Sequence, residues 1–126
     1  MNMRSDDRTM ENYFDTLALL PDGWGDGIHN KRFSKKFLHE TKLFAMKVSS
    51  MIGFDPIITP MDGNSLDLHW KNDKVQLLVN VMEFTPEKCG LFGRTLDGMN
   101  ELKFSGNTDE LLKMIVPVSQ WQLLFE

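Results

Sequence analysis

Hydrophobic residues recur every three or four positions in two stretches near the start of the chain, which is the spacing of one face of an α-helix. The first stretch is residues 9–20, and a Pro-Asp-Gly sequence at 21–23 follows it as a stop signal. The second begins after Ser34, a favourable N-cap, and ends before Gly53, which suits the left-handed position after a helix. Its apolar stripe is wide enough to cover a sheet and contains Phe37, Leu38, Thr41, Phe44, Ala45, Val48, Met51 and Ile52.

From residue 56 onward, apolar and polar residues alternate, which is typical of β-strands. The short segment 56–60 is flanked by prolines, so we expect an edge strand there. Segment 65–70 alternates clearly, and segment 75–84 is partly apolar on both faces, which favours a central strand. Two weaker strands are predicted at 89–95 and 101–106.

The last periodic segment predicts a C-terminal helix. Asn107 or Thr108 is a suitable N-cap, and we expect the helix to end at Pro117, because proline lacks the N–H that a helix interior needs. The order of elements predicts an α+β fold in a single domain, residues 1–126. We expect an antiparallel sheet of four to five strands, with two N-terminal helices and one C-terminal helix packed mainly on one face.

The composition narrows the class of protein. The chain has 126 residues, of which 41% are hydrophobic and 25% charged, as in a globular protein with a real core. The net charge of −4 argues against general nucleic-acid binding. No apolar run is long enough for a membrane span, and the N-terminal residues lack a signal-peptide pattern, so we expect a cytoplasmic protein. The single cysteine, Cys89, excludes an internal disulfide.

The segment LPDGWGDGIHN, residues 20–30, has the composition of a ligand-binding loop, but its spacing fits none of the common ones. It lacks the G-x-G-x-x-G of a dinucleotide site and the Gly-Lys-Ser/Thr of a P-loop. A calcium loop starting at Asp22 would place Trp24 and Phe33 at positions that need oxygen ligands. We therefore predict a structural loop in which Trp24 is buried and aspartates such as Asp26 bond nearby amides.

Metal and catalytic chemistry find little support in the sequence. HETKL at 39–43 lacks the second histidine of a zinc motif, and the three histidines have no metal spacing, so we expect no metal and no cofactor. His69 alternates with the apolar residues of its strand and is interpreted as a surface residue, and Cys89 as a small buried group. An enzyme that uses Asp62, His69 or Cys89 is the least favoured hypothesis, because no coherent catalytic set is present.

Two segments are candidates for contact with a partner. Residues 31–47 hold six of the fourteen basic side chains and one acid, Glu40. A solvated helix face is the simpler interpretation, but such a cluster also suits a contact surface. The C-terminal residues 118–126 are rich in large apolar groups, which suggests either a homodimer contact or a tail folded onto its own sheet. The predicted partner-binding residues are Lys31, Arg32, Lys35, Lys36, Lys42, Trp121, Leu124 and Phe125.

The loop and the strand after it carry a resemblance over residues 20–83. The matching positions are Trp24, Gly25, Asp26, Pro56, Pro60, Asp62, Gly63 and Trp70. In these the chain resembles a diffuse group of small bacterial and phage proteins with a Trp-Asp-Gly-type loop and a segment with two prolines and an Asp-Gly pair before a strand ending in Trp. It departs from that pattern where Gly25 separates Trp24 from Asp26 and where IHN follows the loop. The resemblance implies a fold and a phage or mobile-element setting, but no activity.

The leading hypothesis is a non-enzymatic interaction protein that binds or occludes another macromolecule, such as a phage-encoded inhibitor of a host factor. The alternative is a protein that binds a small anionic molecule in a pocket between sheet and helices, lined by Trp70, Phe44 and methionines. The same residues suit a filled core, so the sequence leaves both interpretations open.

Overall fold

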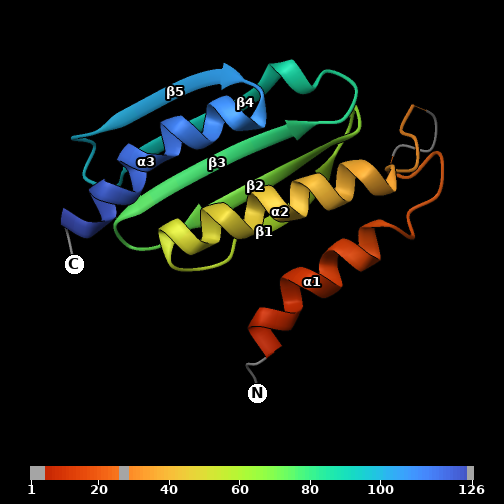
Figure 1. The fold of residues 1–126 in the computed structure, drawn as a ribbon, viewed down its shortest axis with the longest axis horizontal. Coiled ribbons are helices and arrows are strands. Elements are labelled where there is room, and N and C mark those ends of the chain that lie inside the picture. The colour runs from red at the N-terminus through yellow and green to blue at the C-terminus, as the bar shows by residue number, and fades with distance from the viewer. Residues whose placement is uncertain (1–4, 26–28, 125–126) are drawn as a thin grey trace.

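The computed structural model describes residues 5–25 and 29–124, with side chains described for 10–25 and 29–120. Two helices come first, a run of five strands follows, and a third helix closes the chain (Figure 1). The helices are α1 (Ser5–Leu17), α2 (Lys35–Ile52) and α3 (Thr108–Leu124), with a short 3₁₀ helix η1 at Pro86–Lys88. The strands are β1 (Ile57–Met61), β2 (Ser65–Lys71), β3 (Val75–Met82), β4 (Cys89–Thr95) and β5 (Glu101–Gly106).

The strands form one antiparallel sheet in the order β1-β2-β3-β4-β5, so each strand pairs with its neighbours in the sequence. The helices lie together on one face of this sheet (Figure 1). The predicted α+β fold is therefore confirmed, as are the central place of β3 and the edge position of the proline-flanked β1. None of the helices in the described part of the chain is long and apolar enough to cross a membrane.

Helix α2 has the boundaries that its capping residues predict. The Ser34 side chain accepts a hydrogen bond from the Phe37 N–H at 3.1 Å, which satisfies one of the free amides of the first turn. At the other end Gly53 adopts a φ of 102° and donates its N–H to the Ser49 carbonyl. Six side chains of the predicted stripe are buried: Leu38, Thr41, Phe44, Ala45, Val48 and Ile52.

Helix α3 corrects the prediction that the last helix ends at Pro117. The helix begins after a reciprocal cap in which Asn107 and Glu110 each accept the other's backbone N–H. It then continues through Pro117 to Leu124. A proline inside a helix removes one backbone bond, at a cost of about 3 kcal/mol. Burial on both sides of the proline offsets this cost, because Leu111, Ile115 and Val118 are all fully buried against the sheet.

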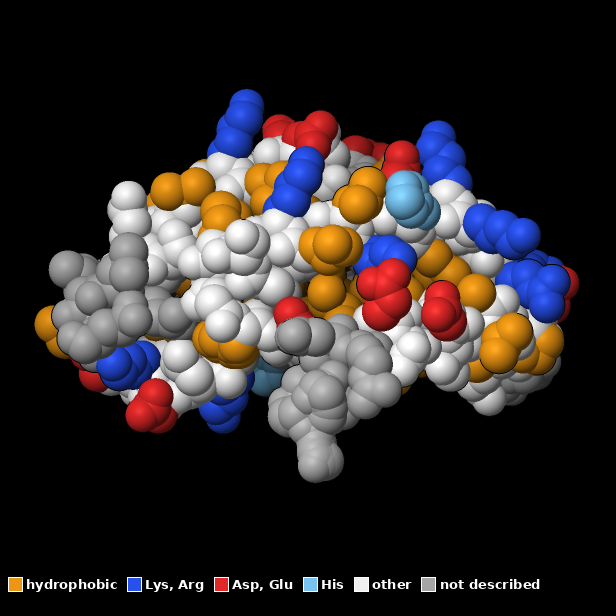
Figure 2. Space-filling model, turned by 60° about the horizontal axis from the view of Figure 1, so that its bottom comes forward, with side chains coloured by type: hydrophobic (Ala, Val, Ile, Leu, Met, Phe, Trp, Pro, Cys, Tyr) orange, Lys and Arg blue, Asp and Glu red, His pale blue; other side chains and the backbone are white. Residues whose placement is uncertain are grey.

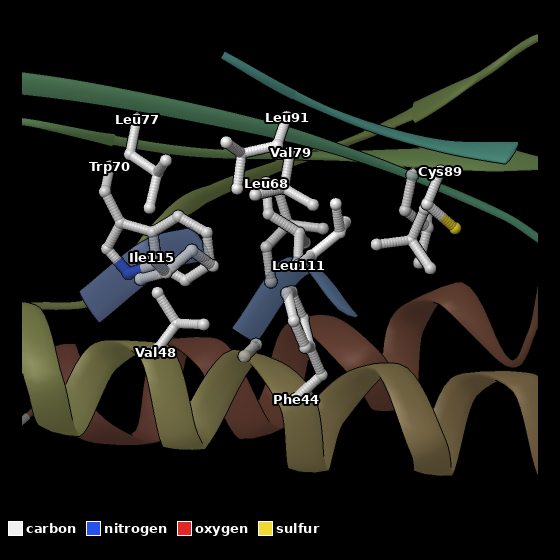
Figure 3. Close-up of a cluster of buried hydrophobic side chains, with 14 of the residues drawn as sticks. Phe44, Val48, Leu68, Trp70, Leu77, Val79, Cys89, Leu91, Leu111 and Ile115 are labelled. Carbon is white, nitrogen blue, oxygen red and sulfur yellow. The ribbon is translucent and has the colours of Figure 1, made fainter. Parts of the chain in front are cut away.

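The core lies between the sheet and the helices α2 and α3. Figure 3 shows Phe44 and Val48 of α2 and Leu111 and Ile115 of α3 meeting the side chains of the sheet. The alternation in β2 acts as predicted, since Leu66, Leu68 and Trp70 are each 0% exposed. The Trp70 indole also donates a hydrogen bond to the Ser49 hydroxyl at 3.2 Å, which fixes α2 against β2.

Candidate interaction surfaces

The corner loop, residues 21–34, joins α1 to α2 and is attached to the turn between β1 and β2. Asn30, which is 1% exposed, makes this attachment. Its amide nitrogen donates to the Trp24 carbonyl at 3.0 Å and to Asp62 Oδ1 at 2.9 Å, and its oxygen accepts the Gly63 N–H at 3.0 Å. Gly25 lies close to this side chain, and a Cβ at that position would meet Asn30 Nδ2 at 3.0 Å. The glycine therefore allows the backbone at position 25 to lie close to the Asn30 side chain.

A second buried amide, Asn64, holds the end of the corner loop. Asn64 is 0% exposed and adopts a left-handed φ of 54°. Its side chain accepts the Lys31 N–H at 2.7 Å and donates to the Lys31 carbonyl at 2.9 Å and to Glu83 Oε1 at 3.0 Å. The other oxygen of Glu83 accepts the Ser34 N–H at 3.1 Å. This network places the start of α2 beside the end of β3.

Trp24 is buried in the corner loop and is 8% exposed. Its indole N–H donates to the Lys31 carbonyl at 2.7 Å, and its ring lies 5.1 Å from the ring of Phe33. Phe33 in turn stacks on Phe37 at 5.6 Å. Gly23 and Gly25 have positive φ angles, which glycine adopts at little cost. These contacts are those of a structural corner, although Asp26 itself lies outside the described residues.

The predicted basic residues do not form one uniform patch. The side chains of Lys31, Arg32, Lys35 and Lys36 are exposed around the start of α2. Lys42, by contrast, forms an ion pair with Glu11 of α1 at 2.8 Å, so its charge is already balanced within the fold. Figure 2 shows one face of the molecule, on which basic side chains are spread out, with acidic and hydrophobic side chains between them.

The C-terminal candidates lie at the end of α3 and beyond it. Trp121 and Leu124 belong to the backbone of α3, but their side chains lie outside the described residues, as does all of Phe125. The prediction of a dimer through this segment assumed that it follows the last helix. That assumption is wrong, because residues 118–124 are part of α3.

The residues proposed for a small-molecule pocket or a catalytic site lie apart. Phe44 and Trp70 pack in the core, which favours the filled-core interpretation of these two residues. His69 lies on the opposite face of the sheet, where its Nε2 is 2.9 Å from Gln76 Nε2. Cys89 is 0% exposed, donates to the Pro86 carbonyl and accepts the Met82 N–H. Burial raises the pKa of its thiol, against the Met82 hydrogen bond, which lowers it.

No group of three His, Cys, Asp or Glu side chains suited to a metal ion exists among the described residues. The described aspartates around the corner loop instead accept hydrogen bonds from backbone N–H groups and a side-chain amide. Asp62 accepts from Asn30, and Asp22 accepts the Arg32 N–H at 2.8 Å.

The face of the sheet opposite the helices, here called the open face, is the remaining surface of interest. Its central part consists of half-buried residues from β2, β3 and β4: Asp67, His69, Gln76, Leu78, Asn80, Met82, Gly90, Phe92 and Arg94. The strand register aligns one row across all five strands, and its members are Ile57, His69, Leu78, Phe92 and Lys103. Lys103 Nζ lies 5.7 Å from the centre of the Phe92 ring.

Polar side chains on the open face are tied to one another on both sides of this row. On one side Arg94 Nε donates to Gln76 Oε1 at 3.2 Å, and Gln76 also contacts His69. On the other side Asn80 donates to Asp67 Oδ1 at 2.8 Å and to Ser65 at 3.2 Å. The open face is thus an apolar centre with an ordered polar surround.

Gly90 in β4 is a glycine that the fold does not require. Its φ is not positive, and a Cβ built on it would meet no atom of the described residues within 4 Å. Gly93, on the core face of the same strand, differs, because a Cβ there would lie 3.0 Å from Val118 Cγ2. Gly93 is explained by packing, whereas Gly90 leaves a bare stretch of backbone between Asn80 and Ser105 on the open face.

Comparisons with family models, with curated proteins and with solved structures found no match to this chain. The resemblance seen in the motifs of residues 20–83 therefore stays a prediction.

Sequence reasoning identified the corner loop but missed the residues that hold it. Asn30, Asn64 and Glu83 come from three separate segments, and their long-range hydrogen bonds join residues 19 to 49 positions apart. The Asp-Gly-Asn sequence at 62–64 was a usable signal, because Asn and Gly favour the left-handed conformation. Gly90 carried a signal too, since glycine is unusual inside a strand.

Proposed function

We propose that this protein is a non-enzymatic binding protein that docks another protein on the open face of its sheet, around Gly90 and Phe92. The observation that carries the proposal is Gly90. A glycine inside a strand weakens the strand, and it often marks a place where another backbone approaches closely. Neither a positive φ nor packing within the described residues accounts for this glycine, and we take close approach by a partner as its explanation.

The composition of the open face supports the same proposal. Leu78 and Phe92 lie directly opposite each other on β3 and β4, at the middle of the sheet. Aromatic and aliphatic side chains at the centre of a surface, with hydrogen-bonding groups around them, are typical of protein interfaces. The polar groups here are already held by one another, so a partner meets side chains whose positions are fixed before binding.

The surroundings of Cys89 and His69 also favour a binding protein over an enzyme. The Cys89 thiol is buried and its pKa is raised, which disfavours the reactive thiolate. His69 is linked to Gln76 in the polar surround of the open face. Both arrangements suit a scaffold and a binding surface.

The test uses tagged protein cross-linked in the cells that express it and recovered for mass spectrometry. Wild type is compared with Gly90→Val and Phe92→Glu on the open face, and with Leu43→Glu, a control at an exposed apolar position of α2. We expect both open-face variants to lose a cross-linked protein that wild type and the control retain. Retention by Gly90→Val, or loss by Leu43→Glu, contradicts the proposal. A bound metabolite in place of a protein favours the small-molecule hypothesis.

A further inference from the structure

The two edges of the sheet differ in their ability to pair with another strand. In β1 the edge is interrupted by Pro60. Along an antiparallel strand, residues bond alternately to the neighbouring strand on one side and to the strand on the other. The Glu83 N–H donates to the Asn64 carbonyl, and this bond determines which residues of β2 bond to β3 and which bond to β1. By this alternation Thr59 bonds to β2 and Pro60 faces outward, where it has no N–H to offer. Proline on an edge is a known protection against strand pairing.

The edge at β5 has no such interruption. The Thr95 N–H donates to the Asn100 carbonyl, so Leu102 and Phe104 bond to β4 by the same alternation. The N–H and C=O groups of Glu101, Lys103 and Ser105 therefore face the free edge. The side chains of these three residues are exposed, and β5 is the outermost strand on its side of the sheet (Figure 1).

The charges on the β5 edge are complementary to a second copy of the same strand. Glu101 and Lys103 are two residues apart, so both side chains point to the open face. When two β5 edges pair antiparallel about a two-fold axis at Leu102, Glu101 of each copy lies directly opposite Lys103 of the other. This register places two opposite-charge pairs across the junction and brings the half-buried Leu102 side chains together on the helix side.

We propose that two copies of this chain pair through their β5 edges in this register and form a continuous ten-stranded sheet. The contact uses the same surface of each copy, so it closes as a dimer. The outer edges of the dimer are the proline-interrupted β1 strands, which stops further growth. The two open faces then form one surface on the same side of the sheet. This inference does not depend on the proposed function, because it rests on the strand edge alone.

The test is a charge exchange followed by sedimentation over a concentration series. Wild type is expected to show a monomer–dimer equilibrium. Glu101→Lys and Lys103→Glu each replace two attractive pairs with two repulsive ones, so each variant alone should dimerise about tenfold more weakly or worse. An equimolar mixture of the two variants restores both attractive pairs and should form a heterodimer. Lys47→Glu, the same charge change on α2, should dimerise like wild type.

Three results overturn the inference. They are a wild-type protein that stays monomeric across the series, single variants that dimerise like wild type, and a mixture that does not recover dimerisation. Binding of another protein to the open face is measured separately, by the cross-linking experiment described above. A failure of the dimer can therefore be distinguished from a failure of the proposed function.

Discussion

Replacement of Trp24 tests whether the corner loop is a structural element. Trp24→Ala removes a ring that is 8% exposed and packed on Phe33, and it also removes the hydrogen bond to the Lys31 carbonyl. Large-to-small changes of buried aromatics cost about 3–5 kcal/mol, which is a large part of the stability of a typical domain. Trp24→Phe should cost only about 1–2 kcal/mol, because the ring contact is largely kept and one hydrogen bond is lost. The Lys31 carbonyl still accepts from Asn64 in this variant.

The assay is urea unfolding followed by far-ultraviolet circular dichroism, which does not depend on the fluorescence of the residue removed. Leu19→Ala serves as the control, because Leu19 is 76% exposed and its truncation should change the free energy of unfolding by less than about 0.5 kcal/mol. The reasoning is refuted if Trp24→Ala unfolds at the same urea concentration as wild type. Loss of partner binding at unchanged stability would make Trp24 a contact residue instead.

Three further predictions concern other parts of the fold. Asn30→Ala should lower the free energy of unfolding by about 2–4 kcal/mol in the same assay, since it leaves buried polar groups of the corner loop unpaired, and an unchanged midpoint would show that the network is not stabilising. Lys35→Glu should raise the free energy of unfolding by about 0.3–1 kcal/mol, because acidic side chains are favourable at a helix N-terminus. Lys47→Glu lies away from that end of α2 and should not raise it. Equal effects of the two substitutions would exclude the helix dipole as the cause. Cys89 should resist alkylation in the folded protein and react in denaturant. Because burial raises its pKa above the ordinary 9.0, wild type should also lose stability relative to Cys89→Ala as the pH rises from that value toward the folded pKa; a constant difference would contradict the burial argument.

The fold was largely predictable because its signals are local. The cap at Ser34, the left-handed Gly53 and the alternation in β2 each depend on a few neighbouring residues. Pro117 shows where local rules fail, since the burial of Val118 against the sheet keeps the helix going past a residue that normally ends one. Tertiary packing outweighs local propensity at that point.

The candidate surface was not predictable in the same way. The charge cluster at 31–47 is visible in the sequence, but the pairing of Lys42 with Glu11 depends on how α1 packs beside α2. The row that joins Leu78, Phe92 and Lys103 depends on strand register, which a single sequence does not specify for weakly alternating strands. Gly90 becomes informative only once the structure shows that its surroundings have room for a side chain.

The central claim is that a partner protein binds the open face of the sheet. Hydroxyl-radical footprinting of the protein alone and in its cross-linked complex tests this claim most directly, because it measures side-chain exposure on the open face and on the helices in one experiment. Met82 and Phe92 report on the open face, and Met46 and Met51, which are 45% and 37% exposed, report on α2. We predict that partner binding protects Met82 and Phe92 from oxidation and leaves Met46 and Met51 unchanged. Protection of the α2 methionines with unchanged oxidation of Phe92 would contradict a binding surface on the open face of the sheet.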